Sequence, residues 1–181
     1  AFMNSMLLKH RQYDKHDNLR IMIPRSVVIA TDYFDEFIRN NGLKYIISQE
    51  FSDEEILSEF VSSTLPYKLR EALKAYVRTV SGPLAVRSSS KLEDSHYQPF
   101  AGIYSTYMIP YTEGNEDRQL RLLQKAIKSV YASTYFAASK AYVQSSQNLI
   151  AEEKMAVVIQ EVCGTEQDGL FFPTLSGVAR S

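Results

Sequence analysis

A short stretch in the middle of the chain combines an arginine with hydroxyl side chains and a glycine. Arg87 follows an apolar run, residues 88–90 are all serines, and Gly102 and Thr106 come shortly after. A guanidinium is a rigid five-donor fork that stays charged at physiological pH and matches phosphate oxygens. The glycine lets backbone N–H groups approach an anion closely, and the hydroxyls add neutral donors. These residue types suit phosphoryl transfer, which depends on positioning and on neutralising charge.

The same stretch has a plain structural interpretation. Serine-rich loops after strands are common, and Arg87 would then pair with Glu93 or Asp94 in the loop that follows. The chain contains neither a Gly-x-x-x-x-Gly-Lys-Ser/Thr loop nor a Gly-x-Gly-x-x-Gly fingerprint. With only seven glycines, any phosphate site must use a different design.

Composition places the chain among soluble globular proteins. Its 181 residues are 45% hydrophobic and 23% charged, with a formal net charge of −1, which argues against disorder. A near-neutral charge gives no electrostatic reason to expect a nucleic acid or a membrane surface as partner. No apolar stretch is long enough for a spanning helix and the start does not resemble a signal peptide, so we expect a cytoplasmic protein.

The single cysteine and the two ends of the sequence lead to three further expectations. Cys163 has no second cysteine for a disulfide or a multi-cysteine metal site, and we expect it to be a small buried hydrophobe in a reducing compartment. The first residue is Ala1 and the last is Ser181, without a helix or cap to complete either end. We therefore expect a fragment of a longer polypeptide.

Hydrophobic periodicity predicts alternating helices and strands. Helices are expected at residues 2–8, from a Thr31-Asp32 cap to Asn41-Gly42, from a Ser52 cap to about 61, from Pro66 to the Ser81-Gly82-Pro83 break, and at about 116–132 and 134–146. Strands are expected at residues 27–30, 84–86, 103–109, 155–159, 170–172 and 177–179. This order predicts a sheet flanked by helices, of the α/β or α+β class.

Side chains in the two later helices are expected to have structural roles. Tyr131, Tyr135, Phe136 and Tyr142 fall at helical spacing, which is typical of core packing and not of a base-stacking platform. Lys125 and Lys128 are expected on a solvated helix face.

The central stretch resembles a family signature. Residues 85–90 (AVRSSS), the acids at 93–94 and residues 100–107 (FAGIYSTY) resemble the ATP-binding domain of phosphoenolpyruvate synthase and pyruvate phosphate dikinase. Residues 21–31, 155–162 and 176–179 resemble three further segments of that family, in the same order. The matches extend over essentially the whole chain.

The resemblance implies an α+β (mixed α/β) fold, the first lobe of an ATP-grasp domain, truncated at both ends. Residues 1–181 would form a partial nucleotide-binding domain, with an entry region at 1–80 and a phosphate-loop and strand region at 81–181. The second lobe, a phosphohistidine domain and an acceptor domain would lie outside the sequence. The glycine-rich segment with a phosphate-binding lysine, which normally precedes the first helix, is not present.

The resemblance also assigns roles to particular residues. Arg87 would contact the ATP phosphates and stabilise charge during transfer, with Thr106 and the backbone near Gly102 as hydrogen-bond donors. Gln160 would lie near the adenine. Glu161 and Val162 would line the base pocket, and Ser88 is a weaker candidate, better suited to holding the arginine and its loop. The Mg²⁺ ligands would lie beyond Ser181.

The implied activity is transfer of a phosphoryl group from ATP to a carrier histidine of the same polypeptide and on to an acceptor. Pyruvate is the acceptor expected first, although a glucan and an antibiotic are acceptors of related modules, and assembly into a homo-oligomer is left open. A nucleotide-sensing regulatory domain and a purely structural α/β domain are the alternatives. The loop itself departs from the family, because His96-Tyr97-Gln98-Pro99 lengthens it and Ile103 replaces a common glutamine.

Overall fold

A computed structural model describes residues 2–9, 23–90, 102, 104–145, 153–173 and 175–177. The chain divides into two compact units. The larger unit is Ser26–Val162, and the smaller one combines Ala1–Arg25 with Cys163–Ser181.

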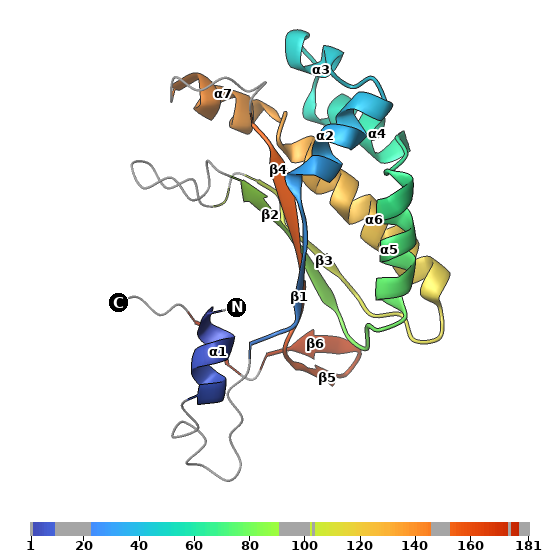
Figure 1. The fold of residues 1–181 in the computed structure, drawn as a ribbon, viewed down its shortest axis with the longest axis vertical. Coiled ribbons are helices and arrows are strands. Elements are labelled where there is room, and N and C mark those ends of the chain that lie inside the picture. The colour runs from blue at the N-terminus through green and yellow to red at the C-terminus, as the bar shows by residue number, and fades with distance from the viewer. Residues whose placement is uncertain are drawn as a thin grey trace. The chain divides into compact units, whose positions relative to one another are not determined.

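The larger unit is built on a four-stranded antiparallel sheet (Figure 1). Its strands are β1 (Ser26–Ile29), β2 (Leu84–Ser90), β3 (Tyr107–Ile109) and β4 (Met155–Glu161), in the order β1-β4-β2-β3. The central ladder between β2 and β4 runs from Leu84 opposite Glu161 to Ser90 opposite Met155. Strand β4, the last of the four in the sequence, therefore lies between β1 and β2, the first two.

Helices lie along one side of this sheet in Figure 1. They are α2 (Thr31–Asn40), α3 (Tyr45–Ser48), α4 (Asp53–Ser62), α5 (Tyr67–Val77) and α6 (Glu116–Ser133). Helix α7 (Ala137–Ser145) lies at the upper end of the sheet in this view. The long helix α6 packs against β2, β3 and β4, while α4 and α5 pack on α6. The predicted mixture of helices and sheet is confirmed, and because each strand pairing of the sheet is antiparallel, the fold is α+β.

The core forms between α6 and one face of the sheet. Strand side chains alternate between the faces, and the inward set on β2 and β4 is fully buried: Leu84, Val86, Met155, Val157 and Ile159. Aromatic rings fill the helix layer, where the Phe34 and Tyr131 ring centroids are 5.0 Å apart. Tyr131 and Tyr135 are buried, and Phe136 and Tyr142 pack against the same core, as predicted. Each such side chain contributes about 1.5–3 kcal/mol through burial.

Two helix starts illustrate local control of the fold. Ser52 forms a capping box with Glu55 at the start of α4, as expected. The cap expected at Thr31-Asp32 is wrong, because α2 already begins at Thr31 and its N-cap, Ala30, has no side-chain hydrogen bond. Asp32 lies in the first turn instead, where its charge complements the helix dipole.

Three other expectations need correction. Strand β2 continues through Ser90, because Arg87 and the three serines pair with β4, and β3 begins only at Tyr107. The amine of Lys128 is not solvated, since it donates hydrogen bonds to the carbonyl oxygens of Val61 and Ser63. Burial lowers the pKa of Lys128.

The smaller unit contains α1 (Phe2–Lys9) and a hairpin of β5 (Thr165–Gln167) and β6 (Leu170–Phe172). The turn is Asp168-Gly169, with φ angles of 53° and 77°, as a type I′ turn requires. Cys163 is exposed, so its expected burial is wrong; it follows the end of β4 and has left the core. The strand predicted at 177–179 is not assigned at Gly177, and residues 178–179 lie outside the described residues. No helix in the described part of the chain is both long and apolar enough to cross a bilayer.

Candidate functional site

Arg87 occupies the face of the sheet opposite to the core. Its neighbours Val86 and Leu84 are fully buried on the helix-covered face, while Arg87 itself is exposed. Among the described residues it takes part in none of the ion pairs. The partners considered in the structural interpretation, Glu93 and Asp94, lie outside the described residues. The strand thus presents a charged guanidinium on an accessible surface.

Two other predicted residues share this face. Gln160 pairs with Ala85 and Val158 pairs with Arg87, so Gln160 and Arg87 are diagonal neighbours on adjacent strands, about 7–8 Å apart. Thr106 immediately precedes β3, and continuing the register from the Val86–Tyr107 pair places it beside Arg87. The strand register therefore brings these three residues to one surface.

The backbone at Gly102 has a conformation that suits glycine. Its φ is +89°, a region that residues with a Cβ rarely adopt. Gly102 is exposed and lies four residues before Thr106, but residues 91–101 and 103 are outside the described part. The bend needed for a glycine-containing loop is thus present at this position.

Apolar side chains surround Arg87 on the open face. Val28 is 63% exposed and Met108 is 68% exposed, and the half-buried Ala156 and Val158 continue the same surface on β4. A sheet face that is simply solvated usually carries polar residues. An apolar surface with one guanidinium is instead typical of a face that binds another molecule or segment.

Two predicted residues, Ser88 and Glu161, are not on this face. Ser88 pairs with the buried Val157, and Glu161 pairs with the buried Leu84, so strand alternation directs both side chains to the helix-covered side. Val162 follows the end of β4, where its N–H donates to the carbonyl oxygen of Pro83 at 3.0 Å. The structure therefore separates Ser88 and Glu161 from Arg87, Thr106 and Gln160, whereas Val162 continues the ladder opposite Pro83 with the same alternation as Gln160.

The apolar surface was missed by sequence reasoning. The sequence predicted a strand at residues 155–159 but did not indicate an open face on it, whereas the burial of β4 alternates strictly from Met155 to Ile159. The signal was present at the C-terminal end of this segment, because the run of apolar residues passes directly into Gln160 and Glu161. Polar residues at a strand end indicate that at least one face is accessible there.

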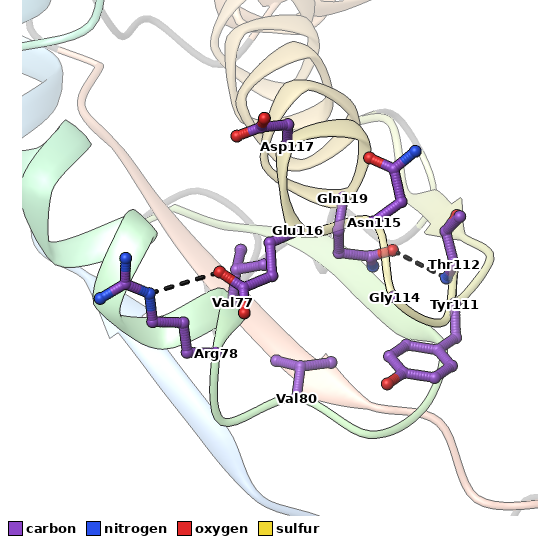
Figure 2. A pocket seen from close by; sticks show the side chains of 10 residues that line it. All are labelled: Val77, Arg78, Val80, Tyr111, Thr112, Gly114, Asn115, Glu116, Asp117 and Gln119. Atoms are coloured by element: carbon purple, nitrogen blue, oxygen red, sulfur yellow. Dashed lines mark hydrogen bonds and ion pairs between the residues drawn. The ribbon is translucent and has the colours of Figure 1, made fainter.

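A separate cavity of about 400 Å³ lies where α5 ends and α6 begins (Figure 2). None of the predicted site residues lines it. Several of its polar groups already have partners: Arg78 Nε lies 3.3 Å from Glu116 Oε2, and the Thr112 N–H donates to Gln119 Oε1 at 3.1 Å. This cavity follows from the capped start of α6. We therefore place the candidate site on the open sheet face, which provides one wall and not an enclosed cavity.

Metal binding has no obvious location within the described residues. They contain no group of three or more His, Cys, Asp or Glu side chains placed to hold an ion. The three ion pairs that join described residues all lie on helices or at the start of β4. The guanidinium of Arg87 is therefore the charge that characterises this face.

The fold and this face define a mixed α/β domain of the ATP-grasp-like class, with an accessible cationic surface on its sheet. The chain belongs to the family described as pyruvate phosphate dikinase, AMP/ATP-binding domain, whose model matches residues 5–181. It is therefore a member of a family of ATP-binding domains.

Two curated relatives agree with this assignment. The chain is 34% identical over 158 residues to an uncharacterized phosphotransferase, YvkC, of Bacillus subtilis (strain 168), covering 83% of this chain and 17% of that protein. It is 29% identical over 174 residues to a phosphoenolpyruvate synthase of Aeropyrum pernix, covering 84% of this chain and 20% of that protein. The chain thus spans about a fifth or less of these relatives.

Proposed function

We propose that this chain is the ATP-binding portion of a cytoplasmic phosphotransferase that moves a phosphoryl group from ATP to a carrier histidine and on to a small acceptor such as pyruvate. The family match and the two relatives support the class. The observation that carries the proposal further is the shared face of Arg87, Thr106 and Gln160. A charged fork and a hydroxyl beside an apolar surface suit a ligand with a phosphate chain and a flat base.

Each residue on this face has a proposed role. Arg87 binds the phosphate oxygens and neutralises the charge that develops during transfer. Thr106 donates a hydroxyl hydrogen bond, and the backbone near Gly102 approaches the phosphates closely. Gln160 hydrogen-bonds the base. Bound ATP would supply the phosphoryl group, and Mg²⁺ held by residues outside this chain would neutralise part of its charge.

Ser88, Glu161 and Val162 have more indirect proposed roles. Glu161 and Val162 contribute to the base pocket through the end of β4, where the chain leaves the sheet. Ser88 stabilises the strand that presents Arg87. Because strand alternation directs the Ser88 and Glu161 side chains to the helix-covered side, we propose that they act through the backbone of their strands.

The proposed domain organisation follows the length of the relatives. Residues 1–181 form part of one ATP-grasp-like domain, with the phosphate-loop and strand region at 81–181. The second lobe, the Mg²⁺ ligands, a phosphohistidine domain and an acceptor domain belong to the rest of the full-length polypeptide. Assembly into a homo-oligomer is compatible with this arrangement.

Titration of ATP in the presence of Mg²⁺ into the full-length polypeptide tests this proposal. Arg87→Ala is expected to weaken binding by about 1–3 kcal/mol, the range for loss of a charged hydrogen bond. Arg78→Ala is the matched control, because Arg78 pairs with Glu116 and lines the separate cavity. Equal affinity of Arg87→Ala and the wild type would exclude the assigned site. ATP binding without phosphorylation of the carrier histidine would favour nucleotide sensing over catalysis.

A further inference from the structure

The segment that leads into β3 is attached by buried side chains to helix α6 and to the residues just before β4. Tyr104 is only 5% exposed, and its hydroxyl donates to Glu153 Oε1 at 3.4 Å. The N–H of Ser105 donates to Ser133 Oγ at 3.4 Å. Two consecutive residues are thus tied down immediately before Thr106.

Glu153 is an unusual residue for this position. It is 8% exposed, and a buried carboxylate costs several kcal/mol unless it is hydrogen-bonded. Burial raises the pKa of Tyr135, and the nearby charges of Asp35 and Glu153 raise it further. Glu153 therefore lies within the core beside two tyrosines, where an apolar residue would cost less.

The second attachment point is itself held in place. Ser133 is fully buried at the end of α6, and its hydroxyl donates to the carbonyl oxygen of Val130 at 2.7 Å. The Ser139 hydroxyl in turn donates to the carbonyl oxygen of Ser133 at 2.7 Å. The Ser133 oxygen that receives the Ser105 N–H therefore has a fixed direction.

These contacts lie next to the candidate site in the chain. Tyr104 is two residues before Thr106, so a shift of Tyr104 is transmitted through at most about 7 Å of extended backbone. The Val86–Tyr107 pair fixes the other side of Thr106 to β2. Thr106 is thus held between one backbone pairing and one buried side-chain attachment.

We propose that Glu153, acting through the Tyr104 hydroxyl, is a positioning residue that fixes Thr106 beside Arg87 for nucleotide binding. This inference rests on the proposed function of the open sheet face. Glu153 and Tyr104 do not touch the nucleotide. They determine the fraction of molecules in which Thr106 is positioned to donate its hydrogen bond to the nucleotide.

Nucleotide titration and steady-state kinetics of the full-length polypeptide test the inference. Tyr104→Phe keeps the ring but removes the hydroxyl, and Glu153→Leu keeps the volume but removes the acceptor. Each variant is expected to raise the ATP Kd and KM roughly two- to tenfold, as loss of one net hydrogen bond does, with a smaller change in kcat. Glu153→Gln keeps an acceptor oxygen and is expected to restore most of the affinity. The double variant Tyr104→Phe/Glu153→Leu should lose less affinity than the sum of the two single losses, because both variants remove the bond between Tyr104 and Glu153.

Tyr131→Phe is the matched control. It removes another core tyrosine hydroxyl, one that has no partner among the described residues, and should leave the ATP Kd unchanged. Wild-type affinity in Tyr104→Phe, with weakened binding in Arg87→Ala, would overturn the positioning role but not the proposed function. Unchanged affinity in Arg87→Ala would overturn the proposed function itself. Equal weakening in Tyr104→Phe and Tyr131→Phe would show a general effect of core stability and overturn the inference.

Discussion

Arg87 and Gln160 are diagonal neighbours on the exposed face of the central β2–β4 ladder, where Ala85 pairs with Gln160 and Arg87 with Val158. They are 73 positions apart in the sequence, and only the antiparallel register brings them together. This relationship makes the sheet face, and not the helix layer, the surface on which ligand binding is best tested.

An acid placed opposite Arg87 should weaken anion binding on this face. In Val158→Glu the new carboxylate faces Arg87 across the ladder, so it pairs with the guanidinium and repels phosphate. We expect the ATP Kd of the full-length polypeptide to rise at least about tenfold, the effect of 1.4 kcal/mol. Val28→Glu, on the same face but one strand further from Arg87, should have a smaller effect. An equal effect of both variants would show that general charge, and not pairing with Arg87, is responsible.

The capping box of α4 should make stability depend on acid pH. The Ser52 N–H and hydroxyl both donate to Glu55 Oε2, and these bonds lower the pKa of Glu55 below its ordinary value of 4.5, the backbone bond most. The ionised form is therefore favoured in the folded state. Its stabilisation is present above the ordinary pKa and is lost as pH falls through the lowered one.

Ser52→Ala should destabilise the protein by about 1 kcal/mol near neutral pH, as loss of an N-cap does. Urea unfolding measured at neutral pH and at about pH 3 should show the difference from wild type shrinking in acid. Glu54→Gln is the control, because Glu54 lies in the same first turn without a bond to Ser52. A constant difference across this pH range would contradict the role of ionised Glu55.

Removal of one buried hydroxyl should not harm the core. Burial raises the pKa of Tyr131, and its hydroxyl has no hydrogen-bond partner among the described residues. Tyr131→Phe should therefore be neutral or stabilising by up to about 1 kcal/mol. Tyr131→Ala, which also removes the ring contacts with Phe34 and Phe37, should cost about 3–5 kcal/mol. Thermal unfolding of both variants measures the contrast, and a destabilised Tyr131→Phe would reveal a partner for this hydroxyl.

Lys128 should stabilise the end of α4 from the neighbouring helix. Its amine donates to the carbonyl oxygens of Val61 and Ser63, which would lose this partner in Lys128→Met. We expect a loss of about 1–3 kcal/mol in the free energy of unfolding. Lys125→Met, at an exposed position of the same helix, should change it by less than about 0.5 kcal/mol. Equal effects would show that the amine contributes only surface charge.

Much of the fold could be predicted from periodicity because the long helices are strongly amphipathic. The spacing of Leu123, Ile127 and Val130 alone places α6 on a core, and all three are fully buried. The extension of β2 through Ser90 could not be predicted, since serines have little strand preference and only pairing with β4 holds them extended. The hairpin at residues 165–172 was missed in part, although its Asp168-Gly169 turn is a strong hairpin signal.

The candidate site was predictable only in part. Residue types in one stretch pointed to Arg87 and Thr106, because a guanidinium and a hydroxyl after a strand suit phosphate. Gln160 came from the family resemblance alone, since nothing local distinguishes it from a solvated strand end. Glu153 was not singled out, because its burial arises from the tertiary packing of Tyr104. Ser88 and Arg87 point to opposite faces of the sheet, and assigning each to its face required the register of the β2–β4 ladder.

The strand order β1-β4-β2-β3 also constrains how the domain is assembled during synthesis. Strand β4 joins β1 to β2, so a growing polypeptide that has not yet reached Met155 has no bridge between its first two strands. The backbone hydrogen bonds inside each helix are local, so individual helices are free to form early, whereas the sheet must await residues about 130 positions after β1. Until then the apolar strands remain open to aggregation, and a translation stop shortly before β4 would leave a helical intermediate with no complete sheet.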